Sequence, residues 1–369
     1  MNHSSEHTPL CFIFVHGFQG WRSYDERYQK MPYWGMRGGD LISFLQSKGY
    51  SAFAASVDPL GSAWDRACEL YAQLAGTKTD YGMAHSREYG HTRFGKDFTG
   101  RELIPSFDRN TRLVLIGHSF GGITANLFAE LMANGDLREK EETDPSEISP
   151  LFQGGMGERI RCVTGIAAGF NGNSSYEIPD DYPIEGSGVK IPWWSRLLAS
   201  RMKNRAKADP KERRDFRDCA EYDMQIDHAC AINERIGVLP HVLYLSVPCC
   251  FTVRNDEGYY VPEKKIEPMF ILKSIQMGRY AGTTENRIEV DAKWRRNDGR
   301  VNTISEIAPF NVFRIPLNRK HLRTGIWNIF PVYHGSHMSL QGGFLFRHDI
   351  RPFYEDLLAM ITAFEDTRV

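Results

Sequence analysis

The sequence lacks a long hydrophobic run, a strong net charge and a paired-cysteine motif. No stretch of about 18 apolar residues occurs, so no membrane-spanning helix is predicted. The formal charge is −1 at pH 7 over 369 residues, which argues against a nucleic-acid partner. The seven cysteines are scattered without CxxC spacing, which favours buried, reduced thiols over a disulfide framework or a cysteine zinc site.

The first residues also lack the pattern of a secretory leader. They contain no basic start followed by an apolar segment and a small-residue cleavage site. The apolar run Leu10–Val15 continues directly into His16 and Gly17, which is typical of a core strand. We therefore expect either a cytoplasmic protein or the mature form of a secreted one.

Short apolar runs alternate with helical patterns along the chain, which predicts a mainly parallel sheet with helices on both faces. The predicted strands are Leu10–Val15, Ser51–Val57, Leu113–Ile116, Ile160–Ala167, Val242–Val247 and a less regular one around Ile329–Tyr333. The predicted helices are Asp40–Lys48, Trp64–Ala75, Gly121–Ala133 and Pro352–Phe364. No fixed-period repeat divides the chain, so a single domain over residues 1–369 is expected.

Residues 170–222 break this alternation. The segment begins with Gly, Pro, Asn and Asp and continues into a basic amphipathic stretch, PWWSRLLASRMKNRAK. The apolar residues between Trp193 and Met202 are spaced so that they share one helical face. The pattern predicts a lid-type insertion within the domain. Such a face suits a lipid–water interface, although ordinary core packing produces the same pattern.

The strongest local signal is GHSFGG at residues 117–122. It follows an apolar strand and opens a helical pattern, which is the setting that a G-x-S-x-G nucleophile turn requires. The small residues let the backbones approach, and the helix N-terminus favours a developing negative charge. The motif predicts that Ser119 is a nucleophile.

A second signal, HGFQG at residues 16–20, directly follows the first strand. In enzymes with this kind of turn, such a loop supplies one oxyanion N–H and the residue after the nucleophile supplies the other. The predicted oxyanion donors are the backbone amides of Phe18 and Phe120.

The acid and the base are expected after the serine in chain order, acid first. The candidate acids are Asp256, Asp291 and Asp298, and the candidate bases are His321, His334, His337 and His348. The bases at 321 and 348 lie in segments typical of the surface, whereas His334 and His337 follow the last predicted strand. Asp298 sits in RRNDG, which is also an ordinary turn sequence. Spacing alone leaves the choice open.

Several long segments resemble the zinc-containing thermophilic lipases of the Geobacillus and Bacillus type. They are YWGMRGGDL (33–41), PLGSAWDRACELYAQLAGTKTDYGMAHSREYGHTRFG (59–95), SPLFQGG (149–155), EYDM (221–224) and WRRNDGRVNT (294–303). The likeness covers most of the chain and is weakest at about 170–220 and after 338. It implies the α/β-hydrolase fold and a Ser-His-Asp triad.

The resemblance implies roles for particular residues. The family's acid falls on Asp298. Its catalytic histidine, ten residues after the tryptophan of a G-V-W-N segment (here GIWN, 325–328), falls on His337. Ser336 stands where the family usually has Asp. The family's structural zinc is bound by two Asp and two His, which correspond to Asp65, His85, His91 and Asp223.

The chain also departs from the family after the catalytic histidine. Many members bind calcium there through acidic residues, but this chain has Ser339 and Phe344 at the expected positions. We therefore expect the calcium site to be absent. Phe120 replaces the family's Gln, which predicts a narrower acyl pocket.

Taken together, the residues and the resemblance predict a serine-dependent carboxylic ester hydrolase with a structural zinc. A lipase that acts on acylglycerols through an acyl-enzyme is the first expectation. A carboxylesterase for shorter, soluble esters is the alternative, because the insertion is short. A non-catalytic binding protein of the same fold is disfavoured by the complete candidate triad.

Overall fold

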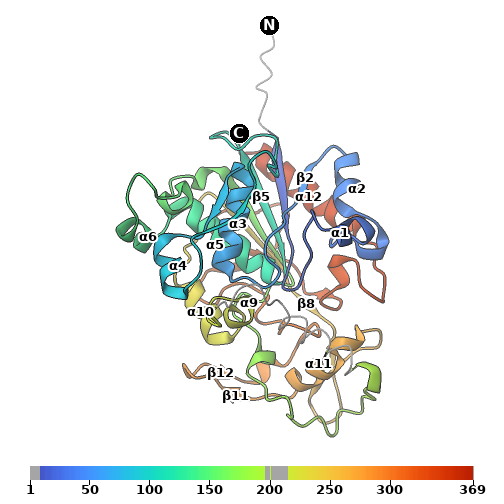
Figure 1. Cartoon of the computed structure of the whole chain (residues 1–369). Helices are drawn as coiled ribbons and strands as arrows, with labels where there is room; N and C mark the ends of the chain where they lie inside the picture. The colour runs from blue at the N-terminus through green and yellow to red at the C-terminus, as the bar shows by residue number, and fades with distance from the viewer. Residues whose placement is uncertain (1–8, 196–199, 201–214, 369) are drawn as a thin grey trace.

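A seven-stranded sheet forms the centre of the molecule (Figure 1). The computed structural model describes residues 9–195, 200 and 215–368. The strand order is β13-β14-β7-β6-β5-β1-β2, and each pairing in it is parallel. These strands are β1 (Leu10–Val15), β2 (Ser51–Ala54), β5 (Arg112–His118), β6 (Ile160–Ile166), β7 (Leu243–Val247), β13 (Arg314–Pro316) and β14 (Trp327–Ile329).

The central strands are apolar on both faces because both faces are covered. In β1, Phe12 and Phe14 contribute to one buried cluster, whereas Ile13 and Val15 contribute to the other. Alternate side chains of a strand point to opposite sides, so a continuous apolar run is what a doubly covered parallel sheet requires. The same run is what makes these strands predictable from the sequence.

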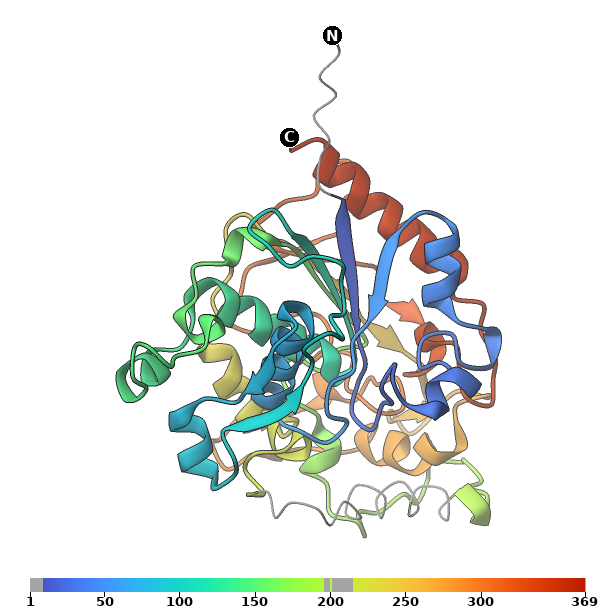
Figure 2. The same cartoon turned by 45° about the horizontal axis from the view of Figure 1, so that its top comes forward.

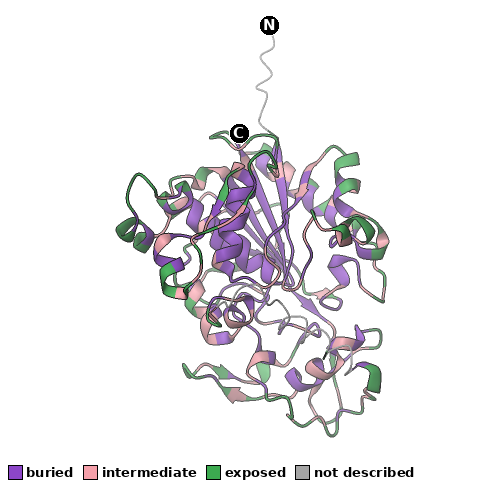
Figure 3. Ribbon diagram, in the orientation of Figure 1, coloured by how far each residue is buried: buried purple, intermediate pink, exposed green. Residues whose placement is uncertain are grey.

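Helices cover the two faces as expected. On one face lie α3 (Ala63–Ala75) and α5 (Phe120–Asn134), and on the other lie α2 (Leu41–Ser47) and α12 (Arg351–Asp366) (Figures 1 and 2). Figure 3 shows that the sheet and the neighbouring sides of α3 and α5 are buried. The predicted α/β-hydrolase architecture is confirmed.

The last predicted strand is divided in two. β14 ends at Ile329 and belongs to the central sheet, whereas β15 (Tyr333–His334) pairs with β8 (Cys249–Cys250) in a separate small sheet. Pro331 lies between them, and proline has no N–H to donate to a strand ladder. The prediction around Ile329–Tyr333 was therefore wrong in treating the segment as one strand.

The remaining elements lie around this core. The short strands are β3 (Lys78–Asp80), β4 (Phe94–Asp97), β9 (Thr252–Arg254), β10 (Tyr260–Pro262), β11 (Gly282–Thr283) and β12 (Glu289–Val290). The further helices are α1 (Glu26–Lys30), α4 (Met83–Tyr89), α6 (Leu137–Glu142), α7 (Pro150–Gln153), α9 (Ala220–Asp223), α10 (Ile226–Glu234) and α11 (Ile271–Met277). In Figure 1, α11, β11 and β12 lie at the end of the sheet where β1 finishes.

The predicted lid-type insertion falls partly outside the described residues, which omit 196–199 and 201–214. Within the described part, Trp193 is 79% exposed and Trp194 is 39% exposed. The division into one domain with an insertion over residues 170–222 stays a prediction. None of the described helices has the length and hydrophobicity that crossing a bilayer requires.

Candidate active site and metal centre

Ser119 occupies a tight turn between β5 and α5. Its φ of 56° and ψ of −129° are unusual for a residue with a side chain, and such conformations cluster at functional sites. Two glycines permit the turn: a Cβ on Gly117 would collide with the backbone of Gly121, and a Cβ on Gly121 would collide with the carbonyl of Val15. The local sequence therefore places the Ser119 hydroxyl at the end of β5.

The loop after β1 lies against this turn. A Cβ added to Gly17 would lie 2.8 Å from the Cβ of Ser119. Next along the chain, Phe18 lines the same cavity as Ser119. Phe120 is the first residue of α5, where backbone N–H groups have no partner within the helix. The two amides predicted to hold an oxyanion thus belong to segments that flank the serine.

His337 and Asp298 form a buried pair. His337 Nδ1 lies 2.6 Å from Asp298 Oδ2, while Asp298 Oδ1 accepts the backbone N–H groups of Arg300 at 2.8 Å and Val301 at 2.7 Å. The backbone N–H of His337 also donates to the carbonyl of Asp298, at 2.9 Å. Burial raises the pKa of Asp298, but the charge of His337 and these hydrogen bonds outweigh it, so the net pKa shift is downward.

The other candidate acids and bases lie elsewhere. The His334 side chain is 72% exposed and faces Glu263. His321 and Asp256 are exposed, and Asp291 caps a short helix by accepting the N–H of Lys293. Of the alternatives that spacing left open, the structure brings together only Asp298 and His337 among the described residues.

A second hydrogen-bond chain links the loop after β1, the predicted oxyanion loop, to the candidate base His337. The Tyr33 hydroxyl accepts the N–H of Gly17 at 2.9 Å and lies 2.7 Å from His118 Nδ1. His118 Nε2 is 2.8 Å from the carbonyl oxygen of His337, so this nitrogen must donate. Burial, aided by His337, lowers the pKa of His118 to about 3, which leaves Nδ1 to accept from Tyr33.

Ser119 and His337 open onto a cavity of about 290 Å³. Its apolar lining includes Phe18, Met36, Met269, Phe270, Met338 and Phe344. A neighbouring cavity of about 640 Å³ shares Phe18, Met269 and Phe270 with it. The Phe120 ring is buried beside the Arg66 guanidinium, whereas Phe344 lines the cavity. Phe344, and not Phe120, is therefore an aromatic side chain in the wall of this cavity.

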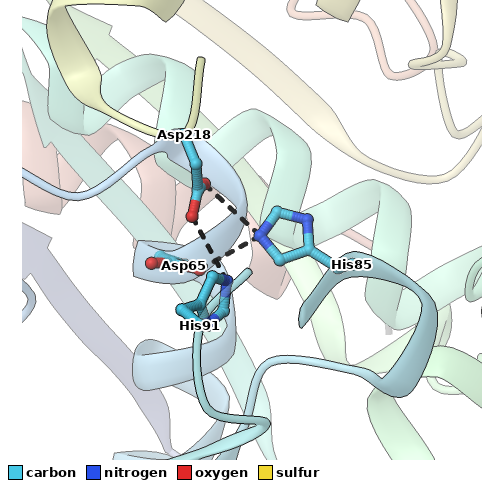
Figure 4. A group of neighbouring side chains, drawn as sticks. All are labelled: Asp65, His85, His91 and Asp218. Carbon is cyan, nitrogen blue, oxygen red and sulfur yellow. Dashed lines mark ion pairs between the residues drawn. The ribbon is translucent and has the colours of Figure 1, made fainter. Parts of the chain in front are cut away.

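A separate cluster on the α3 side of the sheet has the composition of a metal site (Figure 4). His85 Nε2 lies 3.3 Å from an oxygen of Asp65 and 3.3 Å from one of Asp218, and His91 Nε2 lies 3.3 Å from the other oxygen of Asp218. Burial lowers the pKa of His85, but the two carboxylates raise it to a net value of about 9.

These distances fit a shared cation. Ligand atoms about 2.0–2.2 Å from a tetrahedral zinc lie roughly 3.3–3.6 Å from one another, whereas a direct charge-assisted hydrogen bond is about 2.7–2.9 Å long. His91 Nδ1 also lies 2.9 Å from the carbonyl of Thr92, the outer contact that commonly orients a metal-bound imidazole. The four residues are therefore compatible with a structural metal.

The fourth member of this cluster corrects the sequence prediction. The structure places Asp218 there and not Asp223. Asp223 Oδ2 instead accepts the N–H of Ala63 at 2.6 Å, at the N-terminus of α3. Burial raises the pKa of Asp223 to about 7. The resemblance implied Asp223, the aspartate of EYDM, but the aspartate that faces the histidines is Asp218, five residues upstream.

Comparisons with known proteins agree with this fold. Residues 7–181 match the family model "Lipase-like, C-terminal domain". Lipase 2 of Staphylococcus aureus is 30% identical over 351 residues, covering 88% of this chain and 49% of the relative. The chain thus spans about half the length of the curated relatives it matches.

Two solved structures are similar along nearly the whole chain. EstA from Clostridium botulinum has a TM-score of 0.82 and 25% identity, covering 96% of this chain and 87% of EstA. Staphylococcus hyicus lipase has a TM-score of 0.79 and 27% identity, covering 97% of each chain. This chain has the α/β-hydrolase fold of bacterial lipases and esterases. The Ser119 turn lies between β5 and α5, as the G-x-S-x-G motif of that fold requires.

The segment after the candidate base is held by a buried carboxylate from a distant part of the chain, Glu267. The buried Glu267 side chain accepts the N–H of Phe344 at 2.8 Å and that of Leu345 at 3.0 Å. The loss of the calcium site from this segment stays a prediction. Sequence reasoning found neither Glu267 nor Tyr33, because nothing in their immediate sequence marks a buried polar role.

Proposed function

We propose that this chain is a serine-dependent carboxylic ester hydrolase that acts on acylglycerols. The observation that carries the proposal is the arrangement of Ser119: it sits in a strained turn ahead of α5 and lines a cavity together with His337, which is paired with the buried Asp298. The likeness to bacterial lipases and esterases supports the same reaction class.

The acylation step follows from the proton positions. Asp298 accepts the Nδ1–H of His337, which leaves Nε2 with a lone pair for the Ser119 proton. As Ser119 attacks the ester carbonyl carbon, the amides of Phe18 and Phe120 donate to the oxygen that becomes negative. His337 then returns the proton to the leaving alcohol, and the acyl-enzyme remains.

Deacylation reverses these roles. His337 takes a proton from water, the resulting hydroxide attacks the acyl carbon, and the proton returns to Ser119 as the acid leaves. Asp298 stays ionised and stabilises the imidazolium in both halves. In enzymes of this kind, one oxyanion donor contributes about 2.7–4 kcal/mol to the transition state.

The cavity favours an acyl chain over a polar substrate, because most of the side chains around Ser119 are apolar. A carboxylesterase for short esters is the alternative, and Phe344 in the cavity wall is the observation in its favour. The exposed Trp193 and Trp194 support a lid that meets lipid. A rise in rate as the substrate passes its solubility limit would support this lid, and a smooth saturation curve would oppose it.

We also propose that the metal is a structural zinc, as the resemblance to the zinc-containing lipases implies. Asp65, His85, His91 and Asp218 would hold it. A bound zinc would link α3 to the segment around α4 and to the residues before α9, away from Ser119. Its role would be to stabilise the fold, and no step of the reaction passes through it.

Hydrolysis of p-nitrophenyl esters from acetate to palmitate tests the substrate class. Serine-dependent activity that peaks at long chains is the expected result, with Ser119→Ala as the control. A peak at acetate to hexanoate would identify an esterase. Activity that is equal in Ser119→Ala would contradict the proposed mechanism.

A further inference from the structure

Glu306 is a buried carboxyl group next to the candidate triad that the proposed reaction does not use. It lies in the turn that follows Asp298 and is 0% exposed. Its Oε2 accepts the backbone N–H of Cys249 at 2.6 Å. One polar atom each from Glu306, Asp298 and His337 lies within 4.8 Å of the others. Two carboxyl groups therefore share one water-excluded space.

The second oxygen, Glu306 Oε1, is buried and has no donor as a hydrogen-bond partner. An ionised Glu306 would leave this oxygen unsatisfied beside a second carboxylate, which is costly in a buried site. A protonated Glu306 removes both costs, because Oε1–H becomes a donor that Asp298 can accept.

The proton belongs on Glu306 and not on Asp298. Asp298 accepts the N–H groups of Arg300 and Val301 and faces His337 Nδ1 at 2.6 Å, all of which favour its ionised form. Burial raises the pKa of Glu306 well above its ordinary value, and the charge of Asp298 raises it further. The other titratable groups that act on Glu306 include the Cys250 thiol, which raises its pKa as well.

A cation between these three residues is not a better explanation. The 2.6 Å separation of His337 Nδ1 and Asp298 Oδ2 is that of a direct hydrogen bond. It is shorter than the roughly 3.3 Å or more between two ligands of a tetrahedral metal. The Asp65 cluster, with its 3.3 Å distances, shows the contrasting geometry.

We infer that Glu306 is a positioning residue: a neutral carboxylic acid whose Oε1–H donates to the Asp298 carboxylate and holds it toward His337. The inference rests on the proposed function, because it assigns Glu306 a part in orienting that triad. With Glu306 protonated, Glu306 and Asp298 together carry one negative charge, which matches the one positive charge that forms on His337 during acylation. Ionisation of Glu306 would give Glu306 and Asp298 two negative charges in one buried space, and the geometry of the pair would then loosen.

Two substitutions separate positioning from simple packing. Glu306→Gln keeps an oxygen for the Cys249 N–H and supplies an N–H₂ donor to Asp298 that cannot ionise. Glu306→Met has a similar length and no donor. Glu257→Gln, at an exposed glutamate, is the matched control and should behave as the wild type in every assay.

We expect Glu306→Met to lower kcat about 10-fold to 100-fold with little change in KM, since a hydrogen bond to a charged group is lost. Glu306→Gln should restore most of that loss. It should also remove the fall in kcat with rising pH that ionisation of Glu306 causes in the wild type. The downfield proton resonance of His337 Nδ1–H should be kept in Glu306→Gln and shifted or broadened in Glu306→Met.

The inference is overturned if Glu306→Met keeps the wild-type kcat and pH profile, or if Glu306→Gln is as impaired as Glu306→Met. If Glu306→Met does not fold, the dependence of kcat on pH in Glu306→Gln decides: a fall in kcat with rising pH that is the same as in the wild type overturns the inference. Ser119→Ala run in parallel keeps the two claims apart, because full activity in that variant contradicts the proposed function whatever Glu306 does.

Discussion

Replacing Asp218 with asparagine should abolish binding of the proposed zinc, whereas the same change at Asp223 should not. Asp218 presents an oxygen to each imidazole at 3.3 Å, so Asp218→Asn removes a charged group that faces both histidines. Asp223→Asn keeps an oxygen that can accept the N–H of Ala63. The two aspartates lie five positions apart, and both are buried, which makes Asp223→Asn a closely matched control.

The expected magnitude follows from mass action. A zinc ion held at about a thousand times its Kd adds roughly 4 kcal/mol to the free energy of unfolding. At roughly 2.1 cal/mol/K per residue, a 369-residue chain has an unfolding entropy of about 0.8 kcal/mol/K. The wild type should therefore lose about 5 °C in Tm when the metal is removed. The fold should survive, because the two carboxylates and two imidazoles then neutralise one another.

Elemental analysis and thermal melts with and without a chelator measure both effects. The wild type and Asp223→Asn should carry about one zinc per chain and melt lower after chelation. Asp218→Asn should carry little zinc and be insensitive to the chelator. Zinc retained in Asp218→Asn but lost in Asp223→Asn would refute the assignment of the fourth ligand. A wild type without zinc, and with an unchanged Tm after chelation, would refute the metal centre.

Three further changes test other parts of the structure. Gly17→Ala should lower kcat by up to about 10²-fold with little effect on folding, measured by ester hydrolysis, because the new Cβ meets Ser119 and displaces an oxyanion amide. Burial raises the pKa of Glu69 from 4.5 to about 7, so its contribution to the free energy of unfolding is full below pH 4.5 and is lost as the pH rises through about 7. In denaturant unfolding, the free energy of unfolding of Glu69→Gln should therefore fall less between these pH values than that of the wild type, by on the order of 3 kcal/mol. An equal fall in the two proteins would contradict this. Glu365→Ala should lower the free energy of unfolding by about 3–5 kcal/mol in the same assay, because it removes a fully buried carboxylate that contacts three arginines at 2.6–3.0 Å. A loss below about 1 kcal/mol would contradict this.

The sequence predicted the central strands because a doubly covered parallel sheet needs continuous apolar runs. It also predicted the Ser119 turn, because the backbone contacts at positions 117 and 121 leave no room for a Cβ, and both glycines are part of the motif. The division of the last strand at Pro331 was missed, since β14 and β15 pair with different strands that lie far away in the sequence.

The polar partners in the core were harder to predict. Asp218 and Asp223 occupy one short segment, and only the three-dimensional path of the chain decides which carboxylate faces His85 and which meets the N-terminus of α3. The choice between His334 and His337 also depended on burial, which spacing did not reveal. Glu306 resembles an ordinary surface glutamate until its contact with Cys249 is seen.

Labelling with a fluorophosphonate probe, followed by mass spectrometry of the intact protein and its peptides, tests the central claim most directly. The account predicts one adduct per chain, located on Ser119, in the wild type and none in Ser119→Ala. It further predicts much slower labelling in His337→Ala, because the serine then has no base. Equal labelling of Ser119→Ala, or an adduct on another residue, would contradict the assignment of Ser119 as the nucleophile.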